Sequence, residues 1–163
     1  MFKYTICFIK KEDEILLLNR RKKPAMGVWN GVGGKIEKDE TPSESVMREV
    51  LEETGIELKE VTYAGNLILQ SSAGCTGIYL FIAELPKEVS LQTPVHTAEG
   101  ILDWKPVQWI LDKDNIGVIS HLKYYLPNIL AEELHLEHCF KYDKHTILNY
   151  DTHHLNEKSV AYE

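Results

Sequence analysis

Long apolar runs are missing from this sequence of 163 residues, and no hydrophobic stretch approaches the ~20 residues that a membrane-spanning helix needs. The chain enters strand-like sequence at once, without the charged and then apolar segments that are typical of a secretion signal. Cysteine is scarce: the chain has three, Cys7, Cys75 and Cys139. Their number is odd, and their spacing matches no metal-binding pattern. The sequence therefore predicts no membrane partner, a cytoplasmic location and reduced, buried thiols.

Basic side chains are in the minority, because 18 Lys and Arg stand against 25 Asp and Glu and give a formal net charge of −7. A protein that binds nucleic acid or an anionic membrane stably takes its affinity from a basic surface, so the charge argues against both classes. Small anionic substrates remain open, because a bound metal ion reverses the local field.

The length suits a single domain with one substantial core, spanning residues 1–163. Hydrophobic residues make up 44% and charged residues 26% of the chain, which is ordinary for a globular protein. Within this domain we expect residues 135–163 to form a C-terminal extension made of a hairpin and a tail. The sequence leaves open whether the protein is a monomer or a homodimer.

Hydrophobic periodicity predicts several strands. Residues Phe2–Ile9 alternate as in a strand with one buried face, whereas Ile15–Leu18 is apolar on both faces and predicts a central strand. Three later stretches are also expected to be strands, the last of them interrupted by Pro106: Tyr63–Gln70, Thr76–Leu85 and Ile101–Trp109.

A late helix is predicted where apolar residues fall on one helical face, and Pro127 predicts a kink or a restart within it. The residues of this face are Ile119, Leu122, Leu126 and Ile129. The segment from His135 onward holds five of the seven histidines, and we expect a hairpin around Asp143-Lys144. The histidine spacing matches no zinc pattern, so a surface hairpin or a dimer contact is the preferred interpretation. From Asn156 onward we expect a frayed tail.

The most informative stretch is a capped helix in the first third of the chain. Thr41 suits the N-cap, Pro42 the first helical position, and Glu44 can close a capping box. Gly55 can end the helix in a left-handed conformation, so the helix is expected over Pro42–Thr54.

Three carboxylates of this helix, from Glu49, Glu52 and Glu53, fall within an arc of roughly 100°. The opposite side is apolar and is expected to face the core, with Val46, Met47, Val50 and Leu51. Clustered carboxylates repel and raise one another's pKa. Oxygen ligands of this kind suit Mg²⁺ or Mn²⁺.

An acidic helix face is most often an ordinary solvated surface, and that interpretation must be compared with a metal site. The surroundings favour the metal site. Gly33-Gly34 can bring backbone carbonyls close to an ion, Glu40 lies in the approach loop, and Arg48 lies at the rim of the acidic arc. A helix that only needed solubility would not require these residues.

The 23 residues from Gly34 to Ile56 match, at every specified position, the signature of the Nudix hydrolases: G-x5-E-x7-R-E-U-x-E-E-x-G-U, where U is aliphatic. The chain therefore resembles this family. The resemblance implies an α/β fold, the Nudix α/β/α sandwich with a central mixed sheet. It also implies Mg²⁺-dependent (or Mn²⁺-dependent) cleavage of a nucleoside diphosphate linked to another group.

The resemblance assigns roles to matching residues. Glu49, Glu52 and Glu53 look like metal ligands, joined by the Gly33 carbonyl. Glu53 is the first choice as ligand and base, and Glu52 the second. The resemblance also implies a supporting pair, in which Glu40 fixes Arg48 and Arg48 orients the glutamates.

Residue Glu99 lies outside the signature. Family members often place a further acid in this loop as a metal ligand or base, and the alternative is an ordinary loop acid. The implied mechanism uses metal ions that bridge carboxylates and phosphate oxygens, and that lower the pKa of a bound water for in-line attack on phosphorus. A carboxylate takes the proton.

Substrate selection rests on the approach to the motif, where Trp29 and Asn30 are the candidate substrate-binding residues. The residues Trp29-Asn30-Gly31-Val32-Gly33-Gly34-Lys35 resemble the Nudix enzymes that hydrolyse oxidised purine nucleoside triphosphates, including the 8-oxo-dGTP diphosphatases. In that subgroup an asparagine contacts the purine edge, and Asn30 can do the same. The alternative is that Asn30 is a turn residue before glycine.

Three basic residues near the glycine turn are candidates to hold phosphate oxygens: Arg20, Arg21 and Lys35. For these, a solvent-facing role is the alternative. The segment Tyr124–Pro127 also resembles the late helix of the oxidised-purine subgroup. The mammalian members carry a tryptophan and an acidic pair just ahead of it, where this chain has Ile119-Ser120-His121-Leu122.

These observations favour a Mg²⁺-dependent nucleoside triphosphate pyrophosphohydrolase acting on a small nucleotide, with nucleotide-pool sanitation of the 8-oxo-dGTP type as its role. ADP-ribose, dinucleoside polyphosphates and an mRNA cap remain open as substrates. An isoprenoid diphosphate isomerase shares the fold but needs a catalytic cysteine. A non-catalytic nucleotide-binding module is the third interpretation, although such proteins usually lose motif glutamates, which this chain retains.

Overall fold

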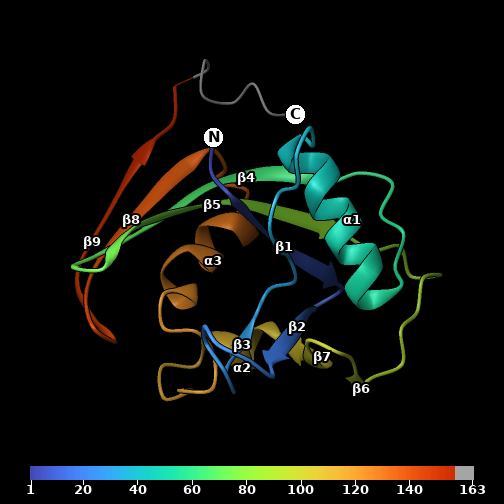
Figure 1. Cartoon of the computed structure of the whole chain (residues 1–163). Coiled ribbons are helices and arrows are strands. Elements are labelled where there is room, and N and C mark those ends of the chain that lie inside the picture. Colours follow the sequence, from blue (N-terminus) through green and yellow to red (C-terminus); the bar gives the residue numbers. More distant parts are fainter. Residues whose placement is uncertain (157–163) are drawn as a thin grey trace.

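The computed structural model describes residues 1–156, and the tail expected to fray continues from there into residues outside the described part. Nine strands form one sheet in the order β6-β7-β2-β1-β5-β4-β8-β9, with β3 paired to β2 (Figure 1). Their bounds are β1 Tyr4–Lys11, β2 Glu14–Arg20, β3 Trp29–Asn30, β4 Thr62–Ser71, β5 Gly74–Glu84, β6 Val95–His96, β7 Gly100–Pro106, β8 Leu136–Asp143 and β9 Thr146–His154. The pairs β1–β5 and β4–β8 are parallel and the other pairs are antiparallel, so the sheet is mixed as expected.

Helices cover both faces of the sheet, which confirms the α/β/α sandwich (Figure 1). On one face α1, Pro42–Thr54, packs Val46 and Val50 against β1, β2 and β5. On the other face α2, Val107–Leu111, and α3, Leu122–Leu130, contribute to a second core. The alternation along the central strands explains the two cores, because successive residues of a strand point to opposite faces. In β2, for example, Leu16 and Leu18 face α1 while Ile15 and Leu17 face α3.

The strand expected over Ile101–Trp109 is too long, because β7 ends at Pro106 and α2 follows directly. Proline has no N–H to donate to a neighbouring strand and fixes its own φ, here −58°. The next residue, Val107, donates its N–H to the Asp13 carbonyl at 2.8 Å, which turns the chain into the helix.

Two expectations about helix faces are also wrong. Ile119 lies before α3, which begins at Leu122. Of the two alternatives at Pro127, the restart is excluded because the helix continues to Leu130, and the kink stays a prediction. On α1, Leu51 is 48% exposed although it was expected to face the core. The sheet contacts only a narrow stripe of this helix, so the residues beside Val46 and Val50 remain at its edge.

The cysteines are free, and they differ in burial. Cys7 is buried in β1 and Cys139 is half-buried in β8, whereas Cys75 is exposed, contrary to the expectation of three buried thiols. The hairpin around Asp143-Lys144 is present as β8–β9. None of the helices in residues 1–156 combines the length and the apolar character needed to cross a membrane.

Candidate active site

Helix α1 presents its carboxylates from a backbone that is fixed at both ends. The Thr41 side chain accepts the Glu44 N–H at 3.2 Å, and the Glu44 carboxylate accepts the Thr41 N–H at 2.8 Å, which completes the capping box. At the other end Gly55 has φ 74° and donates its N–H to the Leu51 carbonyl. The positive φ explains the glycine, and the two caps fix where the acidic face lies.

The glycine pair before the helix lies too close to its neighbours for any side chain. A Cβ on Gly34 would lie 2.3–2.5 Å from the carboxyl atoms of Glu49, and a Cβ on Gly33 would lie 2.1 Å from the Thr5 carbonyl oxygen. The Gly34 carbonyl accepts the Thr5 N–H at 2.9 Å, which ties the loop to β1. The glycines therefore let the loop pass directly against the carboxylates of α1.

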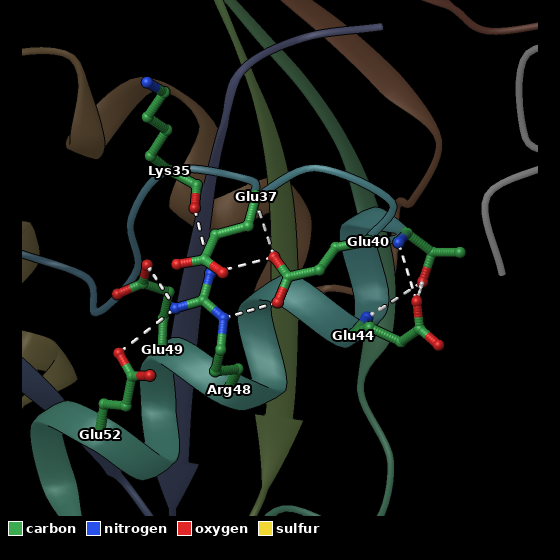
Figure 2. A network of polar contacts seen from close by, with 8 residues as sticks. Lys35, Glu37, Glu40, Glu44, Arg48, Glu49 and Glu52 are labelled. Carbon is green, nitrogen blue, oxygen red and sulfur yellow. Dashed lines mark hydrogen bonds and ion pairs between the residues drawn. The ribbon is translucent and has the colours of Figure 1, made fainter.

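Arg48 is the centre of the polar contacts around these carboxylates (Figure 2). Its Nε and Nη2 donate to the two oxygens of Glu40 at 2.6 and 3.0 Å. Its Nη1 reaches Glu49 at 3.0 Å and Glu52 at 3.3 Å, and Nη2 also donates to the Lys35 carbonyl at 3.1 Å. One guanidinium therefore joins the approach loop to two of the three acids.

The pKa of Glu40, which supports Arg48, is shifted in the opposite direction to the pKa values of Glu49 and Glu53. Hydrogen bonding to Arg48 lowers the pKa of Glu40 to about 2, so this residue is a fixed anion. Burial raises the pKa of Glu49, and burial together with the charges of Glu49 and Glu99 raises the pKa of Glu53 to about 8. An acid that resists ionisation among other acids is at a site that favours a cation.

The donor set fits a hard divalent cation. Glu53 Oε2 is buried and has no hydrogen-bond partner in the described part of the chain. A buried oxygen left unpaired in this way is costly unless a ligand completes it. Glu49, Glu52 and Glu53 line one cavity with Gly33 and Glu99, so the oxygen ligands expected from the sequence are brought together.

This cavity, of about 770 Å³, also receives most of the expected substrate residues. Arg20, Asn30 and Lys35 line it. The Asn30 side-chain oxygen accepts the Gly31 N–H at 2.8 Å, so the turn role and the cavity position coexist.

Two expected substrate residues do not line this cavity. Arg21 is exposed, and its backbone N–H binds the Glu99 carbonyl at 2.9 Å. The Trp29 ring packs with the core on the α3 side, and Lys105 Nζ lies 4.4 Å from its centroid. The pairing of β3 with β2 explains this, because adjacent strand residues point to opposite faces, and Asn30 takes the face of the cavity.

Sequence reasoning did not identify the inner wall of the site. His121 is 3% exposed and lines the cavity together with Thr5 and Ile78. A second cavity of about 1070 Å³ adjoins the first and shares His121, Leu69 and Ile119 with it. The signal that could have pointed to His121 is the resemblance of Tyr124–Pro127 to the late helix of the oxidised-purine subgroup, because His121 lies just ahead of this segment.

Apart from the residues of the two cavities, the histidine-rich hairpin β8–β9 brings together a glutamate, a cysteine and a histidine. The ligand atoms of Glu137, Cys139 and His153 lie within 4.8 Å of one another. His153 Nε2 lies 3.2 Å from Glu137 Oε1, so the group is joined by an ion pair when the histidine is protonated. These three residues belong to β8 and β9, at the edge of the sheet opposite to β6, and none of them lines either cavity.

The raised pKa of Glu53 predicts a pH-dependent stability for the protein kept free of metal. In the folded protein Glu53 has a pKa of about 8, whereas in the unfolded chain it has its ordinary value of 4.5, so the folded state binds the proton more tightly. The contribution of Glu53 to the free energy of unfolding is therefore fully favourable below pH 4.5 and is lost as the pH rises to 8. It amounts to at most about 1.4 kcal/mol for each unit by which the pKa is raised. We expect the melting temperature of Glu53→Gln to exceed that of the wild type by several degrees at pH 8 in EDTA.

This difference should vanish near pH 4.5, as calorimetry at matched pH values can test. The difference between the two proteins isolates Glu53, because Glu40 and Glu44, whose pKa values are lowered, change stability in the opposite direction in both. Glu57→Gln, an exposed acid just beyond the helix, serves as the matched control. A melting difference that stays constant from pH 4.5 to 8 would show that the Glu53 pKa is ordinary.

Comparison with known proteins agrees with this geometry. The sequence model of the NUDIX domain matches residues 3–123. An oxidized purine nucleoside triphosphate hydrolase of Mus musculus is 26% identical over 149 residues, which are 90% of this chain and 91% of that protein. A MutT protein from Bacillus halodurans has a TM-score of 0.74 and 28% identity, covering 93% of this chain and 97% of its own. The NUDIX domain of Shewanella oneidensis NrtR, complexed with ADP ribose, has a TM-score of 0.61 at 17% identity over 78% of this chain and 86% of its own, a likeness of fold alone.

Proposed function

The chain belongs to the NUDIX domain family, and on this premise we propose that it is a nucleoside triphosphate pyrophosphohydrolase. The reaction releases a nucleoside monophosphate and pyrophosphate, and the substrate we favour is an oxidised purine nucleotide of the 8-oxo-dGTP type. The observation that carries the proposal is the buried, unpartnered Glu53 Oε2 in the cavity lined by Glu49 and Glu52. Similarity to the mouse triphosphate hydrolase over nine-tenths of the chain supports the substrate class.

The chain's own residues divide the work. Glu49, Glu52 and Glu53 would hold the cation, and the Gly33 carbonyl and Glu99, which line the same cavity, would complete its surroundings. Divalent Mg²⁺ or Mn²⁺, when bound, neutralises charge on the phosphate oxygens and makes a water molecule a better nucleophile.

Proton transfer is assigned to Glu53. Its Oε2 is buried in the cavity and has no hydrogen-bond partner in the described part of the chain, so this carboxylate has an oxygen available to accept a proton. Glu52, which is more exposed, is the second choice for this step. The water oxygen then bonds to phosphorus while the anhydride oxygen leaves with the pyrophosphate.

Positioning is assigned to Arg48 and Glu40, and phosphate binding to Arg20 and Lys35. Arg48 contacts both Glu49 and Glu52 and is itself held by Glu40. Arg20 is close enough for its charge to lower the pKa of Glu53, so it carries positive charge to the carboxylate end of the cavity. These are the contacts that fix the acids before a substrate arrives.

A second candidate is hydrolysis of a larger nucleoside diphosphate derivative, such as ADP-ribose or a dinucleoside polyphosphate. The second cavity, which adjoins the first, offers room for a further group beyond one nucleoside triphosphate. An isomerase that depends on a cysteine is disfavoured, because none of the residues lining the carboxylate cavity is a cysteine.

A substrate panel tests the proposal. With Mg²⁺ present, we expect release of pyrophosphate from 8-oxo-dGTP and from at least one unmodified triphosphate, with kcat/KM for triphosphates exceeding that for ADP-ribose and dinucleoside polyphosphates. Ion chromatography of the products measures both. A preference for the larger substrates would replace the proposal with the second candidate. Absence of turnover across the panel with both Mg²⁺ and Mn²⁺ would favour a binding module.

A further inference from the structure

His121 lies at the boundary between the two cavities and lines both of them. Apart from Thr76, the other residues shared by the two cavities are apolar: Pro24, Ala25, Leu69 and Ile119. An apolar wall with one buried polar group is the usual environment for a base or another flat ring, since the polar group sets its orientation. Phosphates belong instead with the cation and the basic side chains of the same cavity.

The surroundings of His121 fix both its orientation and its charge. The ring stacks on Tyr125, with centroids 5.6 Å apart at 24°, and lies 5.8 Å from the Phe140 ring. Burial lowers the pKa of His121 to about 3, so the imidazole is neutral at physiological pH. A neutral imidazole has one N–H donor and one acceptor nitrogen.

Tyr125 determines which nitrogen carries the proton. Its hydroxyl lies 3.0 Å from His121 Nδ1, and the residue has no exposed surface. Burial raises the pKa of this hydroxyl well above its usual value, so it keeps its proton. A buried hydroxyl needs an acceptor, and Nδ1 is the one that the described residues provide. Nδ1 therefore accepts, and Nε2 carries the hydrogen.

Asn30, like His121, presents a hydrogen-bond donor to the cavity. Its amide oxygen is engaged by the Gly31 N–H at 2.8 Å, so its NH₂ group is the end that can meet a ligand. Asn30 and His121 therefore each offer a hydrogen-bond donor to the cavity that they both line. Guanine and hypoxanthine carry a carbonyl acceptor at position 6, where adenine carries an amino donor.

We propose that His121 donates a hydrogen bond from Nε2 to the substrate base and selects 6-oxopurines, oxidised guanine included, over 6-aminopurines. The inference rests on the proposed function, because it assigns the base of that substrate to the wall that His121 forms. His121 binds the substrate, and Tyr125 is a positioning residue that acts through it by fixing the tautomer.

The test compares kcat/KM for dGTP, dITP and dATP. We expect the wild type to prefer dGTP and dITP, and His121→Leu, which keeps the apolar packing, to reduce this preference by about 10–100-fold through a higher KM for the 6-oxopurines. Tyr125→Phe keeps the ring volume but frees the tautomer, so it should reduce the preference by a smaller factor. His96→Asn, an exposed histidine in β6, is the control that should leave the ratio unchanged.

Equal losses for all three nucleotides would mean that His121 only supports the fold, and a wild-type preference for dATP would also overturn the inference. If His121→Leu fails to fold, the ratio measured with Tyr125→Phe decides between these outcomes. If no triphosphate is hydrolysed, the proposed function fails, and calorimetry with dGMP and dAMP tests His121 separately. Tighter binding of dGMP that is lost in Tyr125→Phe supports the inference, and equal binding of the two contradicts it.

Discussion

Replacing Glu53 with glutamine is expected to reduce kcat by about three orders of magnitude, within the range that a proton-accepting group supplies. The amide is nearly the same size but cannot take a proton from water or carry the negative charge that a cation needs. Glu53 is also the acid whose pKa is raised most clearly, to about 8, by burial and by the charges of Glu49 and Glu99. Steady-state kinetics at saturating Mg²⁺ with the best substrate of the panel measures the effect.

The same substitution should leave the fold intact and make the metal-free protein more heat-resistant at pH 8, because it removes a buried carboxyl that must ionise at this pH. Activity and stability therefore move in opposite directions, as is typical of residues that serve function. Glu57→Gln changes an exposed acid and should alter neither. A loss of less than tenfold in kcat would transfer the proton-accepting role to Glu52.

The arrangement of the proposed reaction centre was predictable because its geometry is local. Thr41, Glu44 and Gly55 set the ends of α1, and helical spacing alone then places Glu49, Glu52 and Glu53 on one side. The pairing of Glu40 with Arg48 spans eight residues, and the structure contains it at 2.6 Å. Caps and residues at helical spacing can be recognised from the sequence alone, without the tertiary fold.

The wall proposed to bind the base was not predictable in the same way, because its residues come together only through the sheet. His121 reaches the cavity from the segment before α3, and Leu69 from β4. Nothing in the local sequence of His121 indicates that it is buried against Phe140, which belongs to β8. Trp29 shows the converse, since its neighbour Asn30 lines the cavity while strand alternation directs the Trp29 ring to the core.

Removing the Arg48 guanidinium is the second change with a large expected effect, because five hydrogen bonds depend on it. Arg48→Lys keeps the charge but cannot bind both oxygens of Glu40, so we expect kcat to fall by about 10–100-fold, as is usual for residues that orient metal ligands. Arg48→Ala should lose more activity and should also lose about 1–3 kcal/mol of unfolding free energy. This is less than the 3–5 kcal/mol, roughly, of a fully buried pair, because the two side chains are 23% and 18% exposed.

A double variant separates the two roles of this ion pair. In Arg48→Ala the carboxylate of Glu40 is left without its main partner, so adding Glu40→Gln should recover part of the lost stability. It should recover no activity, because Glu49 and Glu52 still lack the donor that orients them. Lys38→Ala, an exposed cation in the same loop, is the control for simple loss of charge. If the double variant regained activity together with stability, Arg48 would act only by supporting the fold, and the acids of α1 would reach their working positions without it.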